Sequence, residues 1–219
     1  SFSETGANEL TVTTMQQAIE IVRKRIDESG TKEPLIQQQG KDRILIQLPG
    51  IDDPERIKRL LGKTAKLTFQ LVNTRVSVED AQQRGRVPPS SVLLKGINNE
   101  TPSYVVYKRV MISGEMLDTA SAGFDQNNSP AVNFQLNAIG GKKFGKVTGE
   151  NIGKPFAIIL DGQVVSAPII RSQIFSNGQI TGNFSVEETK ELSLILRAGA
   201  LPAPLEVLEE RSVGPGLGA

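Results

Sequence analysis

The chain has 219 residues, carries a net charge of +1 and contains neither Cys nor His. That length suits one large domain or two small ones. The balanced charge argues against a general nucleic-acid-binding protein, which needs a basic surface. Without Cys and His, the chain cannot use disulfides, thiolate nucleophiles, ordinary zinc sites or histidine acid–base catalysis.

No apolar run approaches the roughly 20 residues of a membrane-spanning helix. The sequence begins at Ser1, with neither an initiating Met nor a signal peptide. We therefore expect a soluble piece of a longer protein.

The first 72 residues predict the order α-β-β-α-β. Thr14 with Gln17 resembles a helix capping box, and Asp53 followed by Pro54 is typical of a helix start. One further strand in front would complete a ferredoxin-like β-α-β-β-α-β unit, so another segment must supply that strand or the sheet edge stays open. The predicted elements are a loose segment at 1–10, a helix from Thr14 to Gly30, strands at 35–39 and 43–48, a helix from Pro54 to Gly62 and a strand at 66–72.

The rest of the chain begins with a turn-rich, polar excursion at 73–103. A mixture of strands and helices follows, and Ser185 with Glu188 again fits a capping box. The predicted elements are a short helix at 78–84, a strand at 104–112, a loop at 113–130, a strand at 131–136, a helix at 138–148, a hairpin at 156–170, a turn at 176–178, a strand at 179–184, a helix at 185–197 and a last strand at 205–213.

The hairpin at 156–170 is the centre of this arrangement. Residues 156–160 are all apolar, which predicts a strand covered on both faces, with Leu160 buried at its end. Asp161-Gly162 suits a two-residue type I′ turn. Pro168 cannot donate to a sheet ladder, so it marks the edge-facing side or the end of the return strand.

The stretch 140–146 matches the spacing GxxxxGK of a phosphate-binding loop. Val147 stands where such a loop needs a hydroxyl for magnesium, and a helix through the glycines would bury Ile139, Phe144 and Val147. We prefer the helix, and we keep a small-ligand or nucleotide-binding enzyme built on 140–146 as the alternative function. No other group of residues supports catalysis, so we expect no enzyme, no cofactor and no catalytic, cofactor-binding or metal residues.

These elements predict an α+β fold of two lobes. The base lobe comprises 1–72 and 201–219 and is ferredoxin-like but incomplete. The head lobe, 73–200, is an α+β insertion built on antiparallel sheet. The chain crosses between the lobes twice, and we expect a hinge there, formed by Val72, Asn73, Gly199 and Pro202.

Several separated motifs, in order, resemble the SecD family of protein-export membrane subunits. The resemblance covers essentially the whole chain. The motifs are QAIEIVRKRID at 17–27, IQLPG at 46–50, AIILDG at 157–162, VSAP at 165–168, ITGNF at 180–184, LRAGALPAP at 196–204 and VGPGLG at 213–218.

The resemblance implies the large first periplasmic domain of SecD, a member of the RND-type transporter superfamily. In that family a ferredoxin-like base carries an inserted head, which holds an emerging unfolded polypeptide and swings against the base. Proton flow through membrane helices absent from this sequence drives the swing. The implied partners are SecF, the Sec channel and exported polypeptide, with no nucleic acid, and the implied location is the periplasmic face of the bacterial inner membrane.

A third alternative is a purely structural spacer. It predicts no polypeptide binding and no relative motion of the lobes, which separates it from the transport hypothesis.

Overall fold

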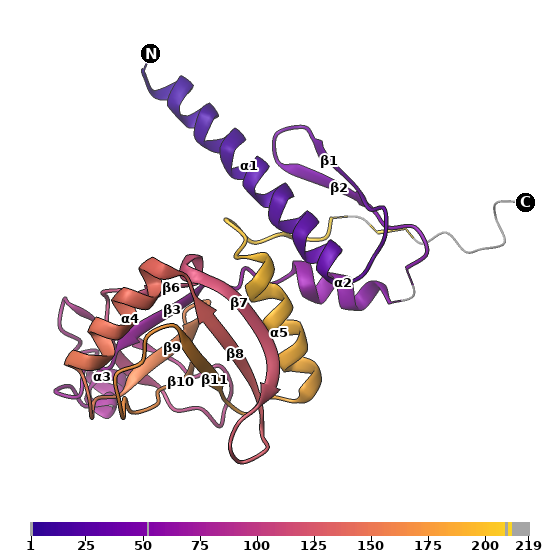
Figure 1. The fold of residues 1–219 in the computed structure, drawn as a ribbon. Helices are drawn as coiled ribbons and strands as arrows, with labels where there is room; N and C mark the ends of the chain where they lie inside the picture. The colour runs from indigo at the N-terminus through magenta and orange to yellow at the C-terminus, as the bar shows by residue number, and fades with distance from the viewer. Residues whose placement is uncertain (1, 52, 209, 212–219) are drawn as a thin grey trace, which may run out of the picture.

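The computed structural model describes residues 2–51, 53–208 and 210–211, and of residues 2–13 only the backbone. It has the predicted α+β character with antiparallel sheets (Figure 1). Among the described helices, none combines the length and the apolar composition that a membrane span requires. The helices are α1 (Phe2–Glu28), α2 (Pro54–Leu61), α3 (Val78–Arg84), α4 (Ala138–Glu150) and α5 (Val186–Ala198), with a 3₁₀ turn η1 (Gly114–Met116).

The strands form one four-stranded sheet of order β10-β9-β3-β6, one three-stranded sheet of order β11-β8-β7, and the two-stranded pairs β1-β2 and β4-β5. Their bounds are β1 (Leu35–Gln39), β2 (Arg43–Gln47), β3 (Leu67–Leu71), β4 (Ser91–Leu94), β5 (Tyr104–Tyr107), β6 (Ile112–Ser113), β7 (Leu117–Phe124), β8 (Pro130–Leu136), β9 (Phe156–Leu160), β10 (Gln163–Ser166) and β11 (Asn177–Thr181).

The predicted hairpin is confirmed as the centre of the four-stranded sheet. All five residues of β9 are buried, and β9 lies between β10 and β3. Asp161 and Gly162 connect β9 to β10 with φ angles of 50° and 79°, as a type I′ turn requires. The return strand is shorter than predicted, since β10 ends at Ser166, before Pro168.

The predicted strand at 66–72 forms β3, but its partners differ from the prediction. β3 pairs along its whole length with β9, from Leu67 opposite Leu160 to Leu71 opposite Phe156, whereas β1 and β2 pair with each other. Four of the five β3 residues are buried, so this strand needs cover on both faces, which a small two-stranded sheet cannot give. The predicted boundary at residue 72 therefore falls after a strand that belongs to the four-stranded sheet of the larger body.

The largest hydrophobic core is organised around aromatic rings. The ring of Phe69 on β3 lies 5.5 Å from that of Phe134, 6.0 Å from Phe144 and 5.8 Å from Phe156. These rings join the two larger sheets to α4. Helix α5 covers β7 and β8 and adds apolar side chains such as Ile195 to the same core.

A second, smaller core holds the N-terminal part together. Val22 and Ile26 on α1 pack with Ile36 on β1 and with Leu201, which follows α5. In Figure 1, α1 and the β1-β2 pair project from the larger body. Helix α2 connects the two parts, because its buried residues Ile57 and Leu60 belong to the larger core.

Several predicted elements differ from the structure. The segment 1–10 was expected to be loose, yet α1 runs from Phe2 through Thr14 without a start there. The loop predicted at 113–130 contains β7, whose residues are mostly exposed and lack an alternating apolar pattern; pairing with β8 and packing of α5 stabilise it. The polar segment 73–103 contains the strand β4, and the strand predicted at 104–112 is divided into β5 and β6. Strand β11 includes Asn177 and Gly178 of the predicted turn. No strand forms at 205–208 and 210–211, and the rest of the predicted last strand lies outside the described residues.

Candidate functional site

Two chain segments connect the N-terminal part to the larger body, and they lie side by side. Residues 62–66 lead from α2 to β3, and residues 199–201 lead away from the end of α5. The backbone N–H of Leu201 donates to the carbonyl oxygen of Thr64 at 2.9 Å. We call these two segments, together with Arg25 and Asp161 that hold them, the junction.

Arg25 on α1 fixes both segments to the N-terminal part. Its side chain is completely buried. One terminal nitrogen, Nη1, donates to the carbonyl oxygens of Leu60 at 2.8 Å and Lys63 at 2.5 Å. The other, Nη2, donates to the carbonyl oxygens of Thr64 at 3.0 Å and Gly199 at 2.9 Å. The rigid fork of a guanidinium suits this task, because it points several donors in fixed directions.

Burial governs the electrostatics of Arg25. Desolvation lowers the pKa of its guanidinium to about 10, while the negative charge of Asp161 opposes that shift. The guanidinium therefore stays charged at neutral pH. Its Nε is buried without a hydrogen-bond partner among the described residues. The four carbonyl oxygens are therefore the acceptors that offset the burial of the guanidinium.

Asp161 in the β9-β10 turn holds the first segment from the opposite side. Its carboxylate accepts from the Thr64 hydroxyl at 2.5 Å and from the backbone N–H groups of Ala65 and Lys66 at 3.0 and 2.9 Å. Ala65 has a φ of 59°, a left-handed conformation that costs a residue with a Cβ about 1 kcal/mol or more. Thr64 is thus shared: its carbonyl binds Arg25, and its hydroxyl binds Asp161.

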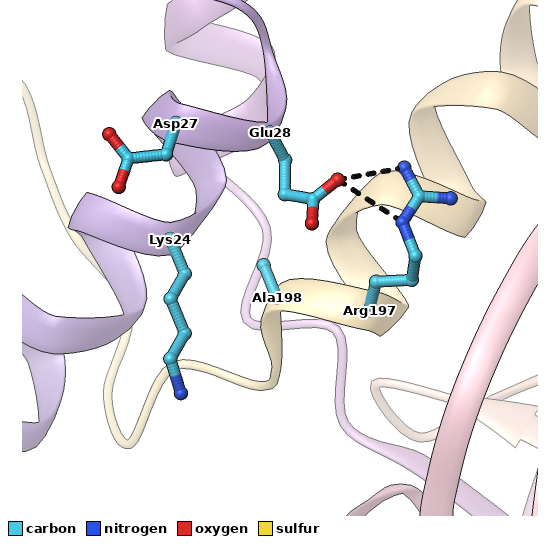
Figure 2. A pocket seen from close by; sticks show the side chains of 5 residues that line it. All are labelled: Lys24, Asp27, Glu28, Arg197 and Ala198. Carbon is cyan, nitrogen blue, oxygen red and sulfur yellow. Dashed lines mark hydrogen bonds and ion pairs between the residues drawn. The ribbon is translucent and has the colours of Figure 1, made fainter.

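A partly exposed ion pair lies beside the junction. Arg197 near the end of α5 donates to Glu28 on α1 at 3.1 Å and to the Ala120 carbonyl at 2.7 Å. A shallow pocket between the two helices is lined by this pair together with Lys24, Asp27 and Ala198 (Figure 2). Partly exposed pairs of this kind contribute about 0–1 kcal/mol each, so the buried Arg25 is the stronger connection.

One of the four predicted hinge residues lies in the junction. Gly199 follows α5 there, and Pro202 comes directly after the second segment. Val72 and Asn73 follow β3, at the end of that strand opposite the 62–66 segment. Val72 bridges to Val106, and the buried Asn73 side chain donates to the Ser91 hydroxyl at 3.0 Å, so both residues are fixed within the larger body.

Sequence reasoning missed Arg25 and Asp161 as junction residues. A signal for Arg25 was present: it follows Val22 by three positions and precedes Ile26, and so lies on the buried face of α1. An arginine in an apolar stripe indicates a buried partner set. Asp161 was interpreted as a turn residue only, and its carboxylate contacts depend on tertiary structure.

The GxxxxGK stretch does not form a phosphate loop. Residues 140–146 lie inside α4, which Asn137 caps, so the glycines do not form a loop in front of a helix. A Cβ on Gly145 would lie 2.4 Å from the ring of Phe175, and one on Gly149 would lie 2.9 Å from the side chain of Gln173. The glycines let the segment 173–176 lie directly on the helix, which is a packing role.

The described residues contain no group of three or more acidic side chains suited to a metal ion. Fold and junction together define an α+β domain with an N-terminal part and a larger body. Two adjacent chain crossings, held by a buried arginine, connect them.

Comparison with known proteins identifies the family. A family model described as the SecDF P1 head subdomain matches residues 90–203, and one described as the N-terminal part of the P1 domain of protein translocase subunit SecDF matches residues 15–74. The chain belongs to the SecDF P1 family.

Individual relatives agree with this assignment. The chain is 51% identical over 222 residues to protein translocase subunit SecD of Rickettsia conorii, covering 100% of this chain and 43% of the relative. It is 46% identical to SecD of Magnetococcus marinus, covering 94% and 40%. The chain thus spans less than half the length of these relatives. A solved structure of SecDF, a membrane component that enhances protein export, is 35% identical with a TM-score of 0.74, covering 92% of this chain and 94% of that one.

Proposed function

We propose that this chain is the periplasmic part of a SecD translocase subunit that binds emerging unfolded polypeptide and moves its head against its base during proton-driven export. The base comprises α1, β1, β2 and the segment from residue 201, and the head comprises the two larger sheets with α4 and α5. SecF and the Sec channel are the proposed partners, at the periplasmic face of the inner membrane. Membership of the SecDF P1 family supports this role.

The observation that carries the proposed motion is the pair of adjacent crossings at the junction. Two parallel connections restrict relative movement to a swing about the line through them. Residues 62–66 and 199–202 take the hinge role, with Gly199 and Pro202 kept from the sequence prediction and Val72 and Asn73 replaced by the segment after α2. Arg25 holds the hinge on the base side and Asp161 on the head side, so the backbone near Thr64 is the pivot.

Such a pivot permits motion with little loss of packing. The small core of the base, around Val22 and Leu201, has its own buried residues, and α2 links it to the large core of the head through Ile57 and Leu60. Between α1 and α5, a swing must break the partly exposed pair Glu28–Arg197, which is weak, and α2 must keep or adjust its packing in the large core.

A reversible crosslink between α1 and α5 tests the motion. In the full-length translocase, Glu28→Cys with Arg197→Cys places one thiol on each side of the junction, on a domain without other Cys. A bifunctional maleimide with an internal disulfide joins them. We expect export to stall when the crosslink is complete and to recover on reduction.

The matched control is Glu20→Cys with Lys24→Cys. It also removes an exposed ion pair and adds the same crosslink, but within α1 alone. Export should be unaffected by this second crosslink. If export continues with the Glu28→Cys/Arg197→Cys crosslink shown to be complete, the swinging-head proposal is wrong and a static spacer is favoured.

A further inference from the structure

The outward face of α4 and the segment beside it expose large apolar side chains. Ile139, Ile152, Ile169 and Phe175 are each 55% to 65% exposed. Apolar side chains of this size are usually buried, and a single exposed one on a protein surface needs no explanation. Ile139 lies on α4, where the prediction that it is buried is wrong because it faces solvent. Ile152 follows the end of the helix, and Ile169 and Phe175 lie on the segment that packs against it.

Backbone contacts make this face continuous. Gln173 donates from its side chain to the Gly145 carbonyl at 2.9 Å, and the Ile174 backbone N–H donates to the Thr148 hydroxyl at 2.9 Å, so this segment lies along α4. The Gly153 N–H donates to the Ile170 carbonyl at 2.7 Å, which brings the end of α4 beside the start of the same segment. We call the surface formed by the exposed residues of 138–154 and 168–176 the α4 face.

The α4 face is also strongly basic. Lys142, Lys143 and Lys146 are exposed and share the outward stripe of α4 with Ile139, and none of the three forms an ion pair among the described residues. Lys154 and Arg171 add two cations at the end of the helix. Glu150 is the only acid in 138–154 and 168–176, although the whole chain has a net charge of only +1.

We propose that the α4 face docks onto the surface of an anionic phospholipid bilayer. Large apolar side chains interleaved with lysines on an exposed helix are typical of elements that lie in a membrane interface, where the apolar groups enter the boundary of the acyl chains and the ammonium groups meet phosphates. This occupant explains both the charge and the apolar side chains. Apolar side chains set among lysines fit the boundary between acyl chains and headgroups, and binding of an acidic polypeptide instead is one of the outcomes tested below. The proposal takes its closeness to a membrane from the proposed function.

Vesicle sedimentation tests the α4 face directly. We expect the chain to sediment with vesicles of phosphatidylglycerol and phosphatidylcholine, to stay in solution with phosphatidylcholine alone, and to be released as salt rises. Lys142→Glu with Lys146→Glu should weaken binding by about thirtyfold or more, since each lysine near an anionic surface contributes roughly a factor of five. Phe175→Ser should weaken binding with the salt dependence unchanged.

The matched control is Lys32→Glu with Lys41→Glu, which changes net charge equally at exposed positions of the base. It should bind like the parent, and thermal unfolding should show that all variants are folded. Equal loss in the control would reduce the effect to net charge and overturn the proposal. Equal binding to both vesicle types would overturn it too. The proposal would also be overturned if the chain did not bind vesicles but bound an acidic unfolded polypeptide in a way that depends on Lys142. That result would assign the α4 face to a protein ligand. None of these results depends on the crosslinking test of lobe motion, so the two proposals fail separately.

Discussion

Arg25→Met tests the role of the buried guanidinium at the junction. Methionine keeps much of the length and apolar stem of arginine but donates no hydrogen bond. The carbonyls of Leu60, Lys63 and Gly199 would lose a donor, while that of Thr64 keeps the Leu201 N–H. A buried acceptor that is left without a donor costs about 1–3 kcal/mol. The variant no longer buries a charge, and this offsets part of that cost. We expect the free energy of unfolding to fall by about 2–4 kcal/mol.

Urea unfolding followed by circular dichroism measures this change as a shift in midpoint at constant slope. Arg25→Lys should be similarly destabilised, because one ammonium cannot reach four carbonyls in a fork. The control is Arg23→Met, an exposed position on the same helix, which should change stability by less than about 0.5 kcal/mol. If the free energy of unfolding of Arg25→Met lies within the same margin of the parent value, Arg25 does not hold the junction together.

The contribution of Arg25 to the free energy of unfolding should not change with pH near neutrality. The pKa of Arg25 is lowered to about 10 in the folded chain, below its unfolded value. At pH values below about 10, both states bind the proton, so their difference in bound protons is zero and stability has no slope from this group. Only above the folded pKa does the unfolded state bind more protons, so stability would then rise with pH. The destabilisation by Arg25→Met should therefore be the same at about pH 6 and pH 8, and a difference between these two values would contradict a pKa near 10.

Three further predictions concern the head. Leu160→Asp places an unpaired carboxylate in the central strand and should lower the free energy of unfolding by about 4 kcal/mol or more; unchanged thermal unfolding would refute the central place of β9. Asp161→Asn keeps a residue that tolerates positive φ but weakens the contacts to Thr64 and its neighbours, so urea unfolding should show a loss of about 1–2 kcal/mol. Calorimetric titration should detect no ATP binding, and micromolar binding that disappears in Lys146→Ala would contradict the helical role of the GxxxxGK stretch.

The strongest local signals in the sequence survive in the structure. The Asp161-Gly162 turn, the Asp53 cap with Pro54 and the Ser185 cap all appear as predicted. These turns and caps depend on backbone preferences and on side chains within four residues, so they form largely independently of the surrounding fold. An unbroken apolar strand such as 156–160 likewise has to be covered on both faces, wherever the rest of the chain lies.

Tertiary structure decided the arrangement of the sheets and the junction. β3 has a clear strand sequence, but only long-range pairing shows that its partner is β9 rather than β1 or β2. β7 lacks an alternating pattern because its exposed residues gain stability from β8 and α5 instead of from burial. The glycines of α4 have the spacing of a phosphate loop, and only the segment 173–176 lying on them shows that they serve packing.

By itself, the sequence determined the class of fold, the central hairpin and the family resemblance, because each depends on neighbouring residues or on ordered motifs along the chain. It could not determine that Arg25 gathers the carbonyls of Thr64 and Gly199, which lie 39 and 174 positions away. A buried charge is stable only where several distant acceptors converge on it, and that convergence exists only once the chain has folded.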